Sequence, residues 1–267
     1  MRFKVILEGD ILPVDYRNHF MGFIKEALKV SDLGKEYFEN LYKYEEGGEI
    51  KNNKSGKPFC FAVRFIHDKE EFKKDKNILY IKTPIEFYIS SPDIGFLVAL
   101  YNGLLSKKLY PFKMGEGEIH KRKSIVLLRE KSIKENKVVF KTLSPILIED
   151  KNDKPLLPIS PEDGKPLYKE SEDFVYFLRE FNYISDTILK SVRGYGLKEG
   201  LDFKPIKLRK EVVKHRVREK DIESKLYTFT CFSGVFELYG DIEDLNYLYQ
   251  LGFGLRRAQG FGMVEVV

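Results

Sequence analysis

Hydrophobic and polar residues recur along this chain with two different periods. Arg2–Glu8 begins with alternating polar and apolar residues, which predicts a strand. After Asp15, a candidate helix cap, apolar residues recur with the 3.6-residue period of a helix face. The residues of that face are Phe20, Phe23, Ile24, Ala27 and Leu28. The beginning of the chain therefore predicts a fold that mixes helices and strands.

The same analysis assigns the remaining segments of the first half. A polar stretch rich in glycine and asparagine, residues 45–56, is expected to be a mobile loop. Strands are expected at residues 57–66, 77–90 and 119–128, and helices at residues 35–42 and 93–105. The resulting order of strand, helix, helix, strand, strand, helix and strand fits a ferredoxin-like unit with one extra helix.

The second half repeats this order. Residues 149–166 contain four prolines and are expected to be irregular. Strands are expected at residues 138–147, 203–218 and 225–239 and near the C-terminus, and helices at residues 171–189 and 241–250. We therefore predict an α+β protein with two tandem ferredoxin-like (RRM-like) domains, residues 1–132 and residues 133–267.

Composition narrows the environment of the protein. Charged residues make up 33% of the chain, and the net charge of +5 is too small to indicate nucleic-acid binding by itself. No apolar run approaches the ~20 residues that span a bilayer, and the first residues lack the apolar core of a secretory signal. We therefore expect a cytoplasmic protein without membrane association.

The sequence contains none of the common metal-binding motifs. Cys60 and Cys231 lie in separate strand-like segments and are expected to be buried thiols. There is no His-x-x-x-His pair, no acidic cluster with metal-ligand spacing and no Walker lysine. We expect neither a metal ion nor another cofactor.

Cations concentrate in the predicted strand of residues 203–218. On a strand, Lys214, Arg216 and Arg218 share one face, and Val213 and His215 lie on the other. Such a row is either a solvated edge that resists aggregation or a track for the phosphates of RNA. The candidate RNA-binding residues in this segment are Lys204, Lys207, Arg209, Lys214, Arg216 and Arg218.

Two Gly-Phe-Gly triplets, residues 252–254 and 260–262, flank five residues near the C-terminus. Glycine permits positive φ and brings amide groups close to an anion. Arg256, Arg257 and Gln259 lie between the triplets as further donors. The segment is either an RNA-binding loop or a turn that only joins two elements. A dinucleotide-binding fingerprint is excluded because a strand follows the loop.

The pattern Gly-x-Gly-x5-Gly-x-Gly at the C-terminus resembles the glycine-rich loop of the CRISPR repeat-processing endoribonucleases of the RAMP superfamily. Weaker similarities occur at residues 1–5, 12–13, 57–61 and 142–146, so the likeness spans essentially the whole chain. It implies two RRM-like domains, CRISPR repeat RNA as the partner, and cleavage without a metal ion. Other CRISPR effector-complex subunits are further candidate partners, and both a monomer and a homodimer are compatible with the sequence.

RNA can be cut by its own 2′-hydroxyl if one group accepts that proton and another protonates the leaving 5′-oxygen. Histidine, with an unperturbed pKa of ~6.5, can do either at neutral pH, and a nearby cation stabilises the transition state. His19 is the preferred histidine because it lies three residues after Tyr16, which resembles the Tyr-x-x-His of one branch of the family. Lys57 matches the family's lysine at the start of a strand.

The sequence departs from the archaeal branch at one position. Tyr42 stands approximately where that branch has its catalytic histidine. Three alternatives follow: His19 has taken over, Tyr42 and Tyr44 work with a lysine, or the protein binds RNA without cutting it. The expected function is a metal-independent endoribonuclease that leaves 2′,3′-cyclic phosphate and 5′-hydroxyl ends. The alternatives are a non-catalytic RNA-binding subunit of a CRISPR effector complex and a metabolic protein built from ferredoxin-like domains.

Overall fold

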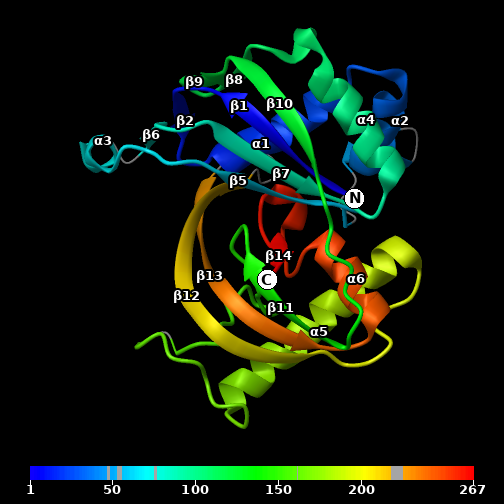
Figure 1. The fold of residues 1–267 in the computed structure, drawn as a ribbon, viewed down its shortest axis with the longest axis vertical. Helices are drawn as coiled ribbons and strands as arrows, with labels where there is room; N and C mark the ends of the chain where they lie inside the picture. Colours follow the sequence, from blue (N-terminus) through cyan, green and yellow to red (C-terminus); the bar gives the residue numbers. More distant parts are fainter. Residues whose placement is uncertain (47–48, 53–55, 75–76, 161, 218–224) are drawn as a thin grey trace. The chain divides into compact units, whose positions relative to one another are not determined.

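The computed structural model describes residues 1–46, 49–52, 56–74, 77–160, 162–217 and 225–267 (Figure 1). The chain forms two compact units. One contains residues 1–57 and 63–128, and the other contains residues 58–62 and 129–267. The change at residue 128 lies close to the expected boundary after residue 132.

The first unit is built on a four-stranded sheet with the order β10-β1-β7-β5, although residues 60–62 of β5 are grouped with the second unit. Its strands are β1 (Arg2–Glu8), β5 (Cys60–Arg64), β7 (Ile85–Ser90) and β10 (Lys121–Leu128). The central strand β1 is antiparallel to both neighbours, with Val5 opposite Phe87 on one side and Ile125 on the other. Val5 and Phe87 are completely buried, so one face of this sheet forms the core of the unit.

Helices α1 (Tyr16–Leu28) and α4 (Ile94–Leu105) pack against the sheet and each other. The ring of Phe20 on α1 lies 5.2 Å from the ring of Phe87 on β7. The five residues of the predicted apolar face of α1 are all fully buried, which confirms that prediction. The extra helix α2 (Asp32–Tyr42) begins three residues before its predicted start because the side chain of Ser31 caps it.

In the described residues of this unit, six short strands, one short helix and one 3₁₀ turn depart from the predictions. Residues 77–90 form two strands separated by Pro84, β6 (Ile78–Tyr80) and β7, and β6 pairs with β2 (Ile11–Pro13), where no strand was predicted. The loop predicted at residues 45–56 is wrong in part, because β3 (Lys43–Glu46) pairs with β4 (Glu49–Asn52). Backbone pairing of this kind requires no apolar period, which explains why the pattern did not reveal it. The remaining elements are α3 (Lys69–Lys74), the 3₁₀ turn η1 (Lys107–Leu109), β8 (Phe112–Met114) and β9 (Gly117–Ile119).

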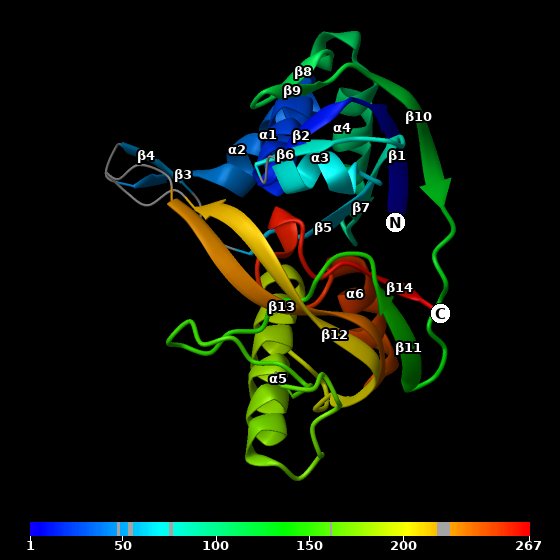
Figure 2. The same ribbon diagram turned by 90° about the vertical axis from the view of Figure 1, so that its left-hand side faces the viewer.

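The second unit contains another four-stranded antiparallel sheet, with the order β12-β13-β11-β14. Its elements are β11 (Lys137–Thr142), α5 (Glu172–Arg193), β12 (Asp202–Val217), β13 (Lys225–Tyr239), α6 (Ile242–Leu251), the 3₁₀ turn η2 (Arg257–Gln259) and β14 (Val264–Val266). Strands β12 and β13 form a long curved hairpin beside α5 (Figure 2). The core is rich in phenylalanine, and the rings of Phe203 and Phe236 stack at 4.8 Å.

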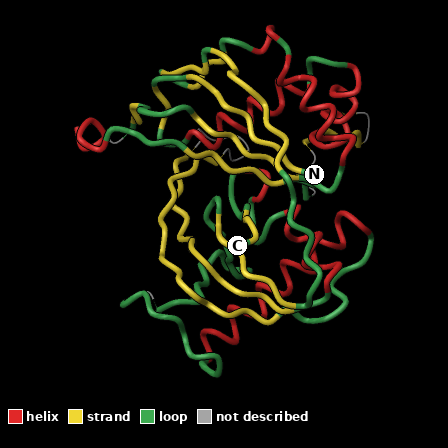
Figure 3. Tube along the Cα trace, viewed as in Figure 1, coloured by secondary structure: helices red, strands yellow, loops and turns green. Residues whose placement is uncertain are grey.

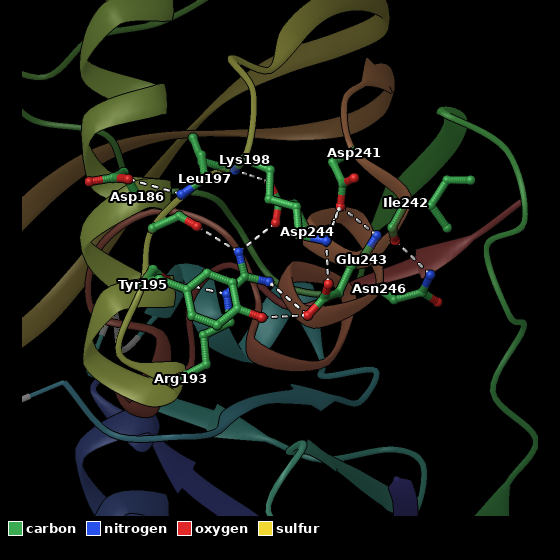
Figure 4. Close-up of polar contacts among 11 residues, drawn as sticks. Asp186, Arg193, Tyr195, Leu197, Lys198, Asp241, Ile242, Glu243, Asp244 and Asn246 are labelled. Carbon is green, nitrogen blue, oxygen red and sulfur yellow. Dashed lines mark hydrogen bonds and ion pairs between the residues drawn. The ribbon is translucent and has the colours of Figure 1, made fainter.

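A buried ion pair joins the end of α5 to the start of α6 (Figure 4). Arg193, whose side chain is 5% exposed, donates to Asp244, whose side chain is fully buried. Asp244 also accepts a hydrogen bond from the backbone N–H of Lys198, and Arg193 donates to the carbonyl of Gly196 at 2.6 Å. Breaking a buried pair leaves an uncompensated charge, so these contacts hold the end of α5 against the first turn of α6.

The two sheets have the same topology. When the four sheet strands of each unit are numbered along the chain, both sheets have the order 4-1-3-2. Each unit also follows the order β-α-β-β-α-β, apart from the inserted helices α2 and α3 and the short strands. Figure 3 shows the helices in red and the strands in yellow. This arrangement is the ferredoxin-like fold, so the α+β prediction with two tandem ferredoxin-like domains is confirmed. In the described parts of the chain, no helix is long and apolar enough to cross a membrane.

Candidate functional site

Two lysines converge on one tyrosine ring in the first unit. Tyr42 ends α2, Lys25 lies in the last turn of α1, and Lys57 precedes β5. The Nζ atoms of Lys25 and Lys57 lie 4.7 Å and 5.4 Å from the centre of the Tyr42 ring. Both distances are typical of cation–π contacts. We call this group the lysine–tyrosine cluster.

Burial changes the acid–base properties of the lysine–tyrosine cluster. Loss of water around Lys57, followed by repulsion from Lys25, lowers the pKa of Lys57 to about 8. Burial raises the pKa of Tyr42 above its ordinary value, so its phenol stays protonated at neutral pH. The cluster therefore presents two cations, one of which can exchange a proton near neutral pH, and a neutral hydroxyl. Such a set can bind a phosphate and protonate a leaving oxygen.

The sequence analysis predicted Lys57 and Tyr42 but missed Lys25. Lys25 follows the buried Ile24 in an ordinary amphipathic helix, and lysine is common on the exposed side of such helices. Only the packing of α1 beside α2 brings Lys25 to the ring of Tyr42.

His19 and Tyr16 occupy the other end of α1. The side chain of His19 is 28% exposed, and its Nε2 lies 4.0 Å from Asp15 Oδ1. The ring of Tyr16 packs edge-on against Phe65 at 5.1 Å. His19 and Lys25 are six residues apart, which corresponds to about 9 Å along the axis and to different sides of an α-helix. The predicted catalytic residues thus form two groups, with His19 and Tyr16 apart from the lysine–tyrosine cluster.

The glycine-rich loop of residues 252–262 closes on itself. The backbone N–H of Phe253 donates to the carbonyl of Gly262 at 2.9 Å, which brings the two Gly-Phe-Gly triplets side by side. Gly262 has φ +73°, and a Cβ atom there would lie 1.9 Å from the carbonyl oxygen of Phe253. Glycine is therefore required for the contact between the triplets.

The amide groups of this loop are directed into the protein. The N–H groups of Gly252, Gly260 and Gly262 donate to the carbonyls of Leu248, Arg257 and Pro145 respectively. The interpretation of these three glycines as an amide cradle for an anion is therefore wrong. A carbonyl inside the fold already satisfies each donor.

The polar side chains of the loop have different environments. Arg256 is half-buried, its guanidinium lies 4.5 Å from the centre of the Phe229 ring, and it donates to Gln259 Oε1 at 3.1 Å. Gln259 Oε1 also lies 3.0 Å from Nε2 of the buried His215. Burial lowers the pKa of Arg256 and leaves it charged at neutral pH. Arg256 and Gln259 therefore form one fixed polar group.

Arg257 lies inside the second unit. Its side chain is buried, and it donates to the carbonyl of Leu251 at 2.7 Å. Burial lowers the pKa of Arg257 to about 10, so it remains a cation at neutral pH. Arg257 thus connects η2 to the end of α6, and this position favours a structural role over contact with RNA.

The basic strand alternates as predicted over its described residues. Lys214 and Arg216 on β12 are exposed, and Val213 and His215 are buried. Arg218 lies outside the described residues. Nearer the start of the strand, Lys204 lies 3.6 Å from Glu237 and Arg209 lies 4.0 Å from Glu211, which partly neutralises them. Lys207 is exposed. Lys214 and Arg216 therefore form an exposed cationic pair on the described part of the hairpin.

The described part of the chain contains no group of three histidine, cysteine or acidic residues arranged to hold a metal ion. Cys60 and Cys231 are buried free thiols, as predicted.

Comparison with known proteins shows which family the chain resembles. Residues 128–266 match the family model "CRISPR associated protein Cas6, C-terminal". The CRISPR-associated endoribonuclease Cas6 1 of Methanocaldococcus jannaschii is 26% identical over 267 residues, which covers 99% of this chain and 92% of that protein. The CRISPR-associated endoribonuclease Cas6 of Pyrococcus furiosus is 27% identical over 256 residues, covering 96% and 83%.

Solved structures share the fold over the full chain. A structure described as a Cas6-related gene product from Pyrococcus furiosus has a TM-score of 0.69 and 23% identity, and covers 100% of this chain and 98% of its own. A structure described as a RAMP protein binding different RNA substrates has a TM-score of 0.68 and 22% identity, covering 100% and 99%. At these identities the similarity establishes the fold.

Proposed function

This chain belongs to the family of the CRISPR-associated protein Cas6, and from that premise we propose that it is an endoribonuclease that cleaves CRISPR repeat RNA. Two relatives that it matches over most of their length are named CRISPR-associated endoribonucleases. The observation that carries the proposal is the convergence of Lys25 and Lys57 on Tyr42. Two cations that repel each other favour a bound anion, and the backbone phosphate of RNA supplies one.

The proposed reaction uses the RNA's own 2′-hydroxyl and requires no metal ion. The 2′-oxygen forms a bond to the adjacent phosphorus as the bond from phosphorus to the 5′-oxygen breaks. The products are a 2′,3′-cyclic phosphate and a 5′-hydroxyl. Lys25 and Lys57 stabilise the added negative charge of the pentacoordinate phosphorus. Lys57, with its pKa lowered to about 8, donates the proton that the leaving 5′-oxygen takes up.

The proton of the 2′-hydroxyl requires an acceptor. In this scheme solvent water accepts the proton, because His19 lies on another side of α1 from Lys25 and the raised pKa of Tyr42 keeps its phenol protonated; His19 is the alternative base that the sequence suggests. Tyr42 is then a hydrogen-bond donor to the phosphate, and Tyr16 supports the start of α1 beside His19. We rank Lys57, Lys25 and Tyr42 above His19, because His19 lies on another side of α1.

The second unit is proposed to hold the RNA. Lys207, Lys214 and Arg216 on the hairpin can contact backbone phosphates, and Arg256 with Gln259 offers a fixed pair of donors. We assign Lys204 and Arg209 a smaller share of the RNA-binding energy, because acidic side chains lie close to them. Arg257 is proposed to maintain the loop from inside.

One observation favours a second candidate function. Tyr42 occupies the approximate position at which the resemblance places a catalytic histidine, and its raised pKa makes it a poor base. A Cas6-family protein with this substitution can bind repeat RNA without cutting it. The second candidate is therefore a non-catalytic RNA-binding subunit that associates with other CRISPR effector subunits.

The test uses the repeat RNA of the cognate CRISPR array, incubated with the full chain in EDTA. We expect cleavage with a 2′,3′-cyclic phosphate end, and a loss of about 100-fold or more in the single-turnover rate for Lys57→Ala. The matched control is Lys35→Ala, since Lys35 is an exposed α2 lysine paired with Asp32. Tight binding without cleavage would establish the second candidate. Cleavage that EDTA abolishes would contradict the metal-free scheme.

His19→Ala separates the two groups of candidate residues. A rate loss comparable to that of Lys57→Ala would make His19 the base. An unchanged rate would remove His19 and Tyr16 from the mechanism and leave the lysine–tyrosine cluster as the site.

A further inference from the structure

Three polar side chains of the second unit form a chain of contacts from its interior to the glycine-rich loop. Gln259 Oε1 lies 3.1 Å from Nη1 of Arg256 and 3.0 Å from Nε2 of His215. His215 on β12 is buried, whereas Arg256 and Gln259 are half-buried. The amide oxygen of Gln259 therefore has a nitrogen neighbour on each of two sides.

The contact with Arg256 fixes which way the Gln259 amide is turned. A guanidinium donates hydrogen bonds and cannot accept one, so the amide atom that faces it must be the oxygen. The same oxygen faces Nε2 of His215, and a hydrogen bond between them requires a hydrogen on that ring nitrogen. His215 therefore carries a hydrogen on Nε2, whether its ring is neutral or charged.

Aromatic rings hold the imidazole of His215 in place. The centre of its ring lies 5.6 Å from that of Phe261 in the glycine-rich loop and 6.0 Å from that of Phe229. Phe229 and Phe261 are themselves buried. The imidazole cannot turn without displacing these packed rings, so the direction of its Nε2–H group is fixed.

Given the proposed role of the second unit in binding RNA, we infer that His215 is a positioning residue for that contact. Together with Arg256, His215 holds the oxygen of Gln259, so the amide nitrogen is left to donate hydrogen bonds to the ligand. Within the described part of the chain, the amide nitrogen of Gln259 makes no hydrogen bond and is not enclosed. His215 thus acts on RNA through Gln259 without touching it.

The occupied oxygen limits what Gln259 can recognise. A glutamine that reads adenine uses its amide oxygen and nitrogen together. Here the oxygen already accepts from two donors, so the NH₂ group alone faces the ligand. The ligand atom must therefore be an acceptor oxygen, and RNA offers two kinds, the phosphate oxygens and the carbonyl oxygens of bases.

The protonation of His215 can be tested without RNA. Nuclear magnetic resonance of the full chain, with nitrogen-15 in its four histidines, distinguishes a ring nitrogen that carries hydrogen from one that does not. The signals that disappear in His215→Phe identify this residue. We expect a hydrogen on Nε2. A bare Nε2 would overturn the proposal, because the Gln259 amide would then have to turn its nitrogen toward the ring.

Binding of the cognate repeat RNA, with a 2′-deoxy group at the cleavage position, tests the consequence for recognition. His215→Phe keeps a ring beside Phe229 and Phe261 but removes the donor, and it should raise Kd about 3- to 10-fold. His215→Gln should recover most of this loss, because its amide nitrogen can reach the position of Nε2. In a Gln259→Leu background, His215→Phe should change Kd less than about twofold, since His215 acts through Gln259.

Gln259→Glu tests the donor group of this side chain. The carboxylate still accepts from His215 and Arg256, but it presents oxygen to the ligand in place of the NH₂ group. We expect RNA binding to weaken about tenfold or more, with no loss of stability in urea. This variant decides the question even if His215→Phe fails to fold, because binding equal to that of the wild type would contradict the proposed donor.

Modified RNAs distinguish the two kinds of acceptor oxygen. One set carries a single methylphosphonate linkage at each position in turn, and the other carries a single abasic nucleotide. The modification that removes the contacted oxygen should weaken binding by the wild type and leave binding by Gln259→Leu unchanged. Equal sensitivity of both proteins at every position would show that Gln259 contacts neither oxygen.

His67→Phe is the matched control, because the ring of His67 lies near those of Phe65 and Phe72 in the first unit. This variant should bind RNA like the wild type. Unchanged affinity in His215→Phe, or an equal loss with and without Gln259, would overturn the positioning role. A wild-type chain that binds no RNA would contradict the proposed function itself, and this role with it.

Discussion

Burial gives Lys57 acid–base properties that an exposed lysine lacks. Partial removal from water and repulsion from Lys25 lower its pKa to about 8, whereas a solvated lysine titrates near 10.4. A lysine with this pKa is a cation at neutral pH that also releases its proton readily. Both properties suit a group that neutralises a phosphate and then protonates a leaving oxygen.

The lowered pKa predicts how cleavage depends on pH. The ammonium form of Lys57 is fully present below its pKa and is lost above it. The value of kcat/KM, which reports groups of the free enzyme, should therefore hold up to pH about 8 and then fall about tenfold per pH unit. The measurement is cleavage of repeat RNA at limiting concentration, with RNA alone as the control for alkaline hydrolysis.

Lys57→Arg provides the comparison for this pH profile. Arginine stays charged over the whole range, so the variant should be slower but should lose the fall above pH 8. If kcat/KM instead rises through pH 8 in the wild type, Lys57 acts as a base and the proposed role is wrong.

At the scale of elements, the glycine-rich loop is a structural joint between α6 and β14. Its two triplets lie against each other, and Phe253 and Phe261 enter two buried clusters. The triplets thereby hold the intervening residues, including Arg256 and Gln259, in one arrangement. Glycine in this segment acts through close packing, and Arg256 and Gln259 are the side chains proposed to contact RNA.

Two alanine substitutions separate close packing from backbone strain. Gly262 and Gly164 have nearly equal φ values of +73° and +71°, but only Gly262 has backbone within 4 Å of an added Cβ. Gly164→Ala should cost about 1–2 kcal/mol of the free energy of unfolding from strain alone. Gly262→Ala should cost about 3 kcal/mol or more, because the clash with Phe253 is added to the strain. Urea unfolding measures the free energy of unfolding of both variants. Equal decreases would show that the loop moves away from the added Cβ of residue 262 at no cost in free energy.

At the scale of the whole molecule, attraction to RNA depends on where cations are concentrated and only weakly on the net charge. A net charge of +5 on 267 residues gives a weak overall attraction to RNA. Strong binding must therefore come from concentrated cations, of which Lys214 and Arg216 are an exposed pair on the hairpin. The opposite, buried face of the strand carries Val213 and His215.

The hairpin cations predict the salt dependence of RNA binding. Each phosphate contact releases counterions and contributes about 0.7 to the slope of log K against log salt for a single strand. The variant Lys214→Ala/Arg216→Ala should therefore reduce that slope by about 1.4, measured with RNA carrying a 2′-deoxy group at the cleavage position. Lys165→Ala, which removes a lysine paired with Asp163 in another loop, should leave the slope unchanged.

The sequence by itself determined the fold and suggested candidate site residues. Periodic apolar residues located the helices and long strands of both units, because the energy of burial depends on which face of an element each residue occupies. The pattern also placed Lys214 and Arg216 opposite the buried side of their strand, as the structure confirms. Lys57 and Tyr42 were predicted as candidates through a family resemblance, and their catalytic roles stay predictions.

Tertiary structure alone decided which of those residues meet. Lys25 joins Tyr42 and Lys57 through the packing of α1 beside α2, and no spacing in the sequence encodes that distance. Packing within the second unit buried Arg257 and directed the glycine amides inward, although the sequence pattern favoured an open anion site. The physical reason is that periodicity reports the environment of one element, whereas pKa shifts and donor satisfaction depend on groups far apart in the chain.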